Sequence, residues 1–156
     1  MKNTFVVSCP IDTFSGYGAR SRDFVKALIE LDEYEVSVIS QRWGNTPENF
    51  IEQNKKEWGF LQKHLILGLQ SKPDIWCQVT VPNEFQPMGK YNIGLTAGME
   101  TTLVHSSWIE GCNRMDIILT SSQHSKTTFI NSQYKAKEGG HVLKVEKPIE
   151  VLFEGV

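Results

Sequence analysis

The chain has 156 residues, the length of one ordinary domain, and folding should bury roughly 68–70% of the surface that the unfolded chain exposes. Its residues are 40% hydrophobic and 22% charged, which excludes a disordered, collagen-like or coiled-coil chain. The formal charge of -2 offers no basic surface to a polyanion, so we do not expect a nucleic-acid partner.

The cysteines and the hydropathy of the chain indicate the compartment in which we expect the protein. The sequence has an odd number of cysteines, and they are far apart: Cys9, Cys77 and Cys112. This argues against a disulfide framework or a zinc site. The amino terminus lacks the apolar core of a signal peptide, and no stretch approaches the roughly 18 apolar residues of a membrane span. We therefore expect a cytoplasmic protein without a membrane span.

Strand and helix patterns alternate along the chain. Short β-rich runs predict strands at 4–8, 35–40, 75–81, 91–96, 116–120 and 149–153. Helical spacing or capping residues predict helices from the glycines at 16 and 18 through 31, from 46–47 through 65 with a break at Gly59, at 108–112, and from 121–122 through 130. Segments 82–87 and 135–147 are expected to be loops.

The alternation has a consequence for the architecture. It predicts an α/β fold: a single Rossmann-like, doubly wound domain over residues 1–156 with a mainly parallel sheet. In the first helix we expect the buried stripe to be Phe24, Ala27, Leu28 and Leu31. Ligands of such sheets bind at the carboxyl ends of the strands, so the segments that follow strands hold the candidate site residues.

The segment Ser15-Gly16-Tyr17-Gly18-Ala19-Arg20-Ser21 follows the first predicted strand. Glycines let backbone N–H groups approach an anion, and a helix amino terminus adds partial positive charge, so Gly16, Tyr17, Gly18 and Arg20 are candidates for binding a phosphate. The alternative is a loop that needs glycine for its own conformation. A dinucleotide is disfavoured because the second strand ends in Ser40-Gln41 without an acid for the ribose, and we expect no cofactor.

Polar residues also follow the later strands. Glu100 and Thr101 come after the strand at 91–96, where a carboxylate can bind sugar hydroxyls or transfer a proton; Glu100 is the catalytic candidate. Asn83 holds the equivalent position after the preceding strand, and for it, as for Glu100, the alternative is a solvated loop residue. Ser121 and Ser122 are predicted helix caps that can also face a ligand.

Metal and common hydrolase motifs are missing from the sequence. The four histidines show no metal-ligand spacing with one another or with the cysteines, so no metal site is predicted. The sequence has no G-x-S-x-G elbow, no G-x-x-x-x-G-K-[ST] loop and no H-E-x-x-H helix. The commonest hydrolase, nucleotide triphosphatase and zinc peptidase classes are therefore disfavoured.

The order of these features resembles the amino-terminal half of GT-B fold glycosyltransferases, especially the retaining, nucleotide-sugar-dependent group called family 4. The resemblance rests on the loop at 15–21, on 35–38, on 92–96 leading to Glu100-Thr101, on Trp108, and on 115–122 with Lys126 and Phe129. It implies half of a GT-B architecture: an acceptor-binding domain that works with a second, donor-binding domain, which has no counterpart in these residues.

The resemblance also implies roles for residues. Gly16 and Gly18 would lie beside the donor phosphates, while Glu100, Thr101, Ser121 and Ser122 would line the acceptor side. Many members carry a histidine where this sequence has Ala97-Gly98-Met99, so the usual sugar-contacting histidine has no counterpart. The implied partners are a nucleotide-sugar donor, a sugar, lipid or protein acceptor, and a donor-binding domain or a second copy of the chain.

A hypothesis from a different class stays open. A free-standing Rossmann-like module could bind a phosphorylated metabolite or a protein partner without catalysis. A flavodoxin-like or nucleotide-hydrolysing domain is a weaker alternative, because the phosphate-loop lysine is missing.

Overall fold

The computed structural model describes residues 2–14, 16–41, 49–96, 106–120, 126–127, 134–135, 142–143 and 145–151. The chain divides into two compact units, and each is described by itself. The first comprises Met1–Val79 with Met88–Lys90, and the second Thr80–Pro87 with Tyr91–Val156.

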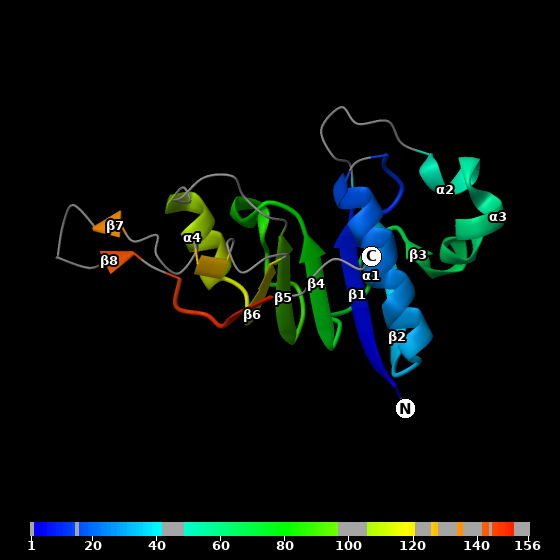
Figure 1. The fold of residues 1–156 in the computed structure, drawn as a ribbon. Coiled ribbons are helices and arrows are strands. Elements are labelled where there is room, and N and C mark those ends of the chain that lie inside the picture. Colours follow the sequence, from blue (N-terminus) through cyan, green and yellow to red (C-terminus); the bar gives the residue numbers. More distant parts are fainter. Residues whose placement is uncertain are drawn as a thin grey trace. The chain divides into compact units, whose positions relative to one another are not determined.

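The first unit is built on four parallel strands in the order β3-β2-β1-β4 (Figure 1). They are β1 Asn3–Cys9, β2 Tyr34–Ser40, β3 Leu65–Ile66 and β4 Ile75–Val79. Phe5 lies beside Val36 of β2 and Ile75 of β4, so β1 is flanked on both sides. This position accounts for the apolar run Phe5-Val6-Val7 at the centre of β1, because a strand between two parallel neighbours is expected to be buried.

Helix α1, Gly16–Leu31, packs against β1 and β2. The Phe5 ring meets Phe24 of α1 edge-on, with the ring centroids 6.5 Å apart. Since alternate residues of a strand point to opposite faces, Phe5, Val7 and Cys9 face this helix, whereas Thr4, Val6 and Ser8 face the other side of the sheet.

The buried stripe of α1 differs from the predicted one. Its fully or almost fully buried residues include Gly18, Ser21, Arg22 and Val25. Ala27 and Leu31 are exposed, so the predicted stripe is wrong at these two positions. The physical reason is helical spacing: residues 18, 21, 22 and 25 share one face, and Ala27 and Leu31, two and six positions after Val25, lie on the other side of the helix.

The region after β2 contains short helical pieces in place of one long helix. They are α2 Phe50–Gln53, α3 Lys55–Trp58 and the 3-10 helix η1 Gly59–His64. The Asn54 side chain donates to the carbonyl of Phe50 at 2.9 Å at the junction of α2 and α3. The break at Gly59 is confirmed, but Leu65, predicted to be helical, begins β3. Thr46 and Pro47 lie outside the described residues.

The second unit contains three parallel strands in the order β5-β6-β9. They are β5 Tyr91–Thr96, β6 Ile117–Thr120 and β9 Ile149–Val151. Helix α4, Ser106–Asn113, packs on the 3-10 turn η2, Pro82–Glu84. Fully buried side chains of this unit include Phe85, Leu95, Ile109, Met115 and Ile118.

Two segments of this unit that were predicted to be loops contain regular structure. Residues 82–84 form the η2 turn, in which Phe85 N–H donates to the carbonyl of Pro82 at 3.1 Å. Residues 134–135 and 142–143 form an antiparallel pair, β7 Tyr134–Lys135 and β8 Val142–Leu143. Polar composition and the two glycines between them predicted a loop there. A two-residue strand is too short to show the alternation of apolar and polar residues that indicates a strand.

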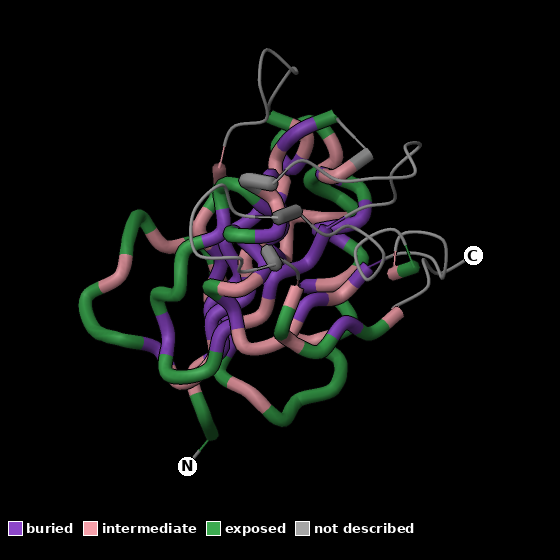
Figure 2. The backbone as a smooth tube through the Cα atoms, turned by 90° about the vertical axis from the view of Figure 1, so that its left-hand side faces the viewer, coloured by how far each residue is buried: buried purple, intermediate pink, exposed green. Residues whose placement is uncertain are grey.

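The α/β class with parallel strands is confirmed, and it is consistent with a Rossmann-like domain. Residues 5–9 of β1 are buried, whereas most of residues 67–72 are exposed, and Figure 2 colours the backbone by this burial. In the described part of the chain, no helix has the length and apolar character needed to cross a membrane.

The close contact between Gly111 of α4 and the η2 turn predicts a strong mutational effect. A Cβ atom at Gly111 of α4 would lie 1.7 Å from the carbonyl oxygen of Pro82, so a side chain there must separate α4 from η2. We expect Gly111→Ala to lower the free energy of unfolding by about 3 kcal/mol, measured by urea denaturation. A Cβ at Gly68 meets no atom within 4 Å, so Gly68→Ala should change it by less than about 0.5 kcal/mol. Equal effects of the two variants would contradict this packing.

Candidate functional site

The candidate site of the first unit lies where β1 ends and α1 begins. Cys9, the last residue of β1, leads into a turn in which Thr13 N–H and Thr13 Oγ1 both donate to the carbonyl of Pro10, at 3.3 and 3.0 Å. Ile11 and Thr13 are fully buried. The turn therefore lies against the unit and carries the chain from the carboxyl end of the strand to the start of the helix.

Gly18 lets this turn approach α1 closely. A Cβ atom there would lie 2.5 Å from both the carbonyl oxygen and Oγ1 of Thr13, and 3.0 Å from the carbonyl oxygen of Pro10. Contacts under 3 Å cannot be accommodated without movement of the turn, so any larger residue would push it away. This geometry favours a packing role for Gly18, one of the two roles that the sequence left open.

Arg22 holds the turn from the helix side. Its guanidinium Nη1 donates to the carbonyls of Ile11 at 3.0 Å and Thr13 at 2.7 Å, and the side chain is almost fully buried. The same guanidinium lies over the Phe50 ring, 3.4 Å from its centroid, in a cation–π contact. Burial lowers the pKa of Arg22 from its ordinary value, an effect opposed by the charges of Asp23 and Asp12.

Asp12 connects the turn to α2. Its carbonyl accepts from Phe50 N–H at 3.0 Å, and its carboxylate Oδ1 accepts from Ile51 N–H at 2.8 Å. The residue that precedes α2, Asn49, has a left-handed backbone with φ 72° and makes no side-chain cap. Asp12 therefore caps α2 from 39 positions away in the sequence.

Gln41 joins the carboxyl ends of three strands. Its backbone N–H donates to the carbonyl of Cys9 at 2.9 Å, and its Nε2 donates to the carbonyl of Val79 at 2.7 Å. Its Oε1 accepts from Ser8 Oγ at 3.1 Å. The amide thus fixes β2, β1 and β4 relative to one another at the edge where α/β sheets bind their ligands.

The remaining candidates on α1 lie in its first two turns. Gly16 opens the helix, and Tyr17 is half-buried with its carbonyl accepting from Ser21 Oγ at 2.6 Å. Arg20 is buried. The structure thus brings Tyr17, Gly18 and Arg20 together at the helix start, beside the turn after β1. Arg22, Asp12 and Gln41 were missed by the sequence analysis, since nothing in local spacing links them.

Asn83 lies in the second unit, on the η2 turn, and is exposed. Arg114 holds this turn: its Nη2 donates to the carbonyl of Asn83 at 3.0 Å, and its Nε donates to the carbonyl of Phe85 at 2.8 Å. The Glu84 carboxylate accepts from the Thr80 hydroxyl. The backbone of Asn83 has a structural role, and its exposed side chain is consistent with the solvated alternative.

Four candidates lie outside the described residues: Glu100, Thr101, Ser121 and Ser122. The strands that precede them are described, and these pair in register, with Thr96 beside Thr120. β5 and β6 therefore end at neighbouring positions, Thr96 and Thr120.

The described residues hold no group of three or more histidine, cysteine or acidic side chains that could bind a metal. All three cysteines are free and buried. Burial raises the pKa of the Cys9 thiol to about 12, even though hydrogen bonds with Ser21 and the Ile11 backbone act in the opposite direction. Burial also raises the pKa of Cys112 to about 12 and that of Cys77 above its ordinary value. These thiols are not poised as nucleophiles.

The sequence was compared with known proteins. No protein-family model matches it, and no curated protein matches it. The resemblance to glycosyltransferases stays a prediction that rests on the residues quoted for it.

The position of Arg22 predicts its contribution to stability. Arg22→Met keeps much of the apolar stem but leaves the buried carbonyls of Ile11 and Thr13 without this donor, so we expect the free energy of unfolding to fall by about 2–4 kcal/mol. Lys26→Met removes an exposed cation from the same helix and should cost less than about 1 kcal/mol. Urea denaturation of both variants checks this, and similar losses would show that Arg22 does not hold the turn.

The buried thiols predict a loss of stability at alkaline pH. Their pKa values are raised in the folded state, so the folded chain keeps these protons while unfolded thiols ionise from about pH 8.5 upward. The unfolded state then binds fewer protons, and stability falls as pH rises toward about 12. Between about pH 8 and pH 9.5 we expect a loss of about 1 kcal/mol per thiol.

Urea denaturation at the two pH values measures this loss, and Cys112→Ala should reduce it by one thiol's share. A pH dependence unchanged in that variant would contradict burial of the Cys112 thiol.

Proposed function

We propose that this chain is the acceptor-binding half of a hexosyltransferase. In this proposal it works with a donor-binding domain that holds a nucleotide sugar, and the joined cleft moves the hexose to an acceptor. The proposal takes its chemistry from the sequence resemblance to GT-B glycosyltransferases. The observation that carries it is the hydrogen-bonded edge at the carboxyl ends of β1, β2 and β4. There Gln41 fixes the strands, and α1 begins.

The rigidity of this edge supports a positioning role. Arg22, Asp12 and Gln41 hold the turn, α2 and three strand ends by hydrogen bonds of 2.7–3.1 Å. Holding a substrate in one orientation supplies a large part of the rate of a two-substrate transfer. A half-cleft that positions the acceptor alone should therefore transfer little sugar without its donor-binding partner.

The acceptor residues of the proposal follow β5 and β6. β5 and β6 are parallel, and their last residues, Thr96 and Thr120, are in register. Glu100 is the proposed acid or base of the acceptor side, and Thr101, Ser121 and Ser122 supply hydroxyl donors. Gly16 supplies the close backbone approach at the start of α1.

Reconstitution tests the proposal. The chain is mixed with the donor-binding domain of a family 4 glycosyltransferase, with UDP-glucose as the donor probe and a panel of mono- and disaccharides as acceptors, and transfer is measured. We expect no transfer by the chain alone and measurable transfer in the mixture. Glu100→Ala should lower it by about 100-fold or more, because a positioned acid or base contributes at least that much.

The control is Glu30→Ala, which removes an exposed carboxylate from α1 and should leave transfer unchanged. Transfer that survives both Glu100→Ala and Gly16→Val would overturn the site assignment. Absence of transfer in every pairing, with the chain shown to be folded by circular dichroism, would overturn the function and leave the free-standing binding module as the hypothesis to pursue.

A further inference from the structure

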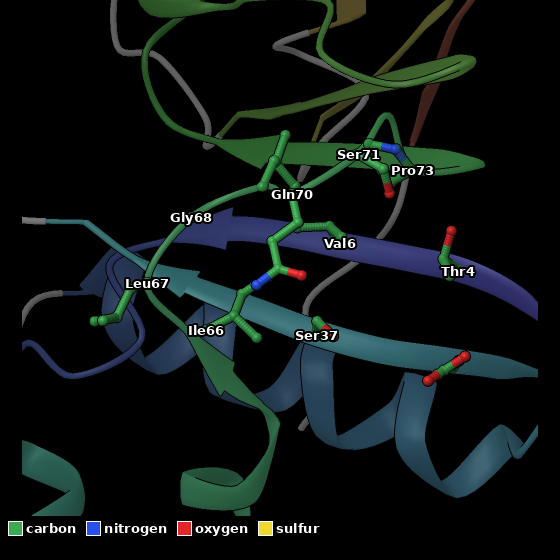
Figure 3. Close-up of a pocket in the computed structure, with 11 residues that line it drawn as sticks. Thr4, Val6, Ser37, Ile66, Leu67, Gly68, Gln70, Ser71 and Pro73 are labelled. Carbon is green, nitrogen blue, oxygen red and sulfur yellow. The ribbon is translucent and has the colours of Figure 1, made fainter.

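The first unit has a groove on the face of its sheet opposite α1. It has a volume of about 770 Å³, within the range of small-molecule sites. β1 and β2 form its floor, and the segment after β3 forms its wall (Figure 3). The residues that line it are Thr4, Val6, Glu35, Ser37, Ile66, Leu67, Gly68, Leu69, Gln70, Ser71 and Pro73.

The groove exists because no helix covers this face between β3 and β4. A parallel connection usually carries a helix that packs on the sheet. Here β3 ends at Ile66 and β4 begins at Ile75, and the eight residues between them contain neither helix nor strand. In Figure 3 this segment crosses above β1 and β2, with Gln70 reaching down over Val6 while Leu67 points away. This irregular segment leaves open the space that a packed helix would fill.

The floor of the groove is polar where a doubly covered sheet would be apolar. Strands buried on both faces read as continuous apolar runs, yet the positions of β1 and β2 that face the groove include Thr4, Glu35 and Ser37. The Thr4 hydroxyl is already bonded to Asp74, at 3.2 Å to Oδ2 and 2.9 Å from the backbone N–H. The side chains of Glu35 and Ser37 have no hydrogen bond or ion pair with any other described residue.

The wall adds more polar groups of the same kind. The side chains of Gln70 and Ser71 also make no hydrogen bond within the described residues. Val6, Ile66 and Pro73 give the groove an apolar surface between these groups. Glu35 carries the one charge of the lining, since no lysine, arginine or histidine is among the lining residues described.

We propose that this groove binds a small hydroxylated amine, of the amino-sugar type. The Glu35 carboxylate pairs with the ammonium group, and the serine hydroxyls and the Gln70 amide bond the ligand hydroxyls. The carbon face of the ligand packs on Val6 and Ile66. Phosphorylated and acidic ligands are disfavoured because the lining offers no cation to neutralise them.

This site is separate from the one in the proposed function. The groove uses Thr4, Val6, Glu35 and Ser37, which lie before the carboxyl ends of their strands and on the face away from α1. The edge described above uses Gln41, Arg22 and the turn at 10–13. The groove needs no donor-binding domain, so its test is independent of reconstitution.

Three ligands that share a hexose ring and differ in charge test the proposal. Glucosamine, glucose and glucuronate are titrated into the chain at about pH 6.5, where the amine is protonated and the acid ionised, and backbone amide shifts are followed by NMR. We expect glucosamine to bind with a Kd of about 1–10 mM, glucose about fivefold more weakly, and glucuronate not at all. The shifts should map to Ser37, Gly68 and Ser71.

A matched pair of variants isolates the carboxylate. Glu35→Gln keeps shape and removes the charge, and it should make glucosamine and glucose bind equally. Glu33→Gln removes the same charge from an exposed residue outside the groove and should keep the fivefold preference. Equal binding of glucosamine and glucose to the unchanged chain, no saturable shift with glucosamine, or shifts confined to residues outside the groove would each overturn the proposal.

Discussion

The turn at the carboxyl edge of the first unit depends on the buried guanidinium of Arg22. The Arg22 guanidinium lies inside the unit, and burying a charge is costly unless it is satisfied by hydrogen bonds. The carbonyls of Ile11 and Thr13 satisfy it, and the Phe50 ring contacts its face. The turn after β1 is therefore fixed on α1, and the start of α2 is fixed on the turn. The position of the turn at this edge depends on this side chain and its acceptors.

The same edge shows why a glycine pattern is an ambiguous sign of a phosphate site. Gly18 is needed because the turn carbonyls and the Thr13 hydroxyl occupy the space of a side chain. A close backbone approach to a ligand would require the same residue type. Local sequence cannot separate these two causes, since both require a glycine at the start of the helix. The contact with Thr13 shows that packing by itself already requires a glycine at position 18.

The two faces of the first sheet have different partners for a topological reason. α1 connects β1 to β2 and covers the face that bears Phe5, Val7 and Cys9. The connection from β3 to β4 is too short to carry a helix, so the opposite face keeps Thr4 and Ser37 in an open groove. Alternation along β1 and β2 thus produces one apolar face and one partly polar face from the same two strands.

The sequence by itself determined the α/β class, the parallel strands and the start of α1 at the glycines, because β-rich runs, helical spacing and glycine positions are local signals. It misjudged the exposed Ala27 and Leu31, the strand at Leu65 and the β7–β8 pair, where the deciding contacts come from distant or very short segments. Of the candidate site, it predicted the first turns of α1 and missed Arg22, Asp12 and Gln41. Only the tertiary structure decided those roles, because a hydrogen bond such as the one between Asp12 and Ile51 spans 39 positions and leaves no spacing that a sequence can show.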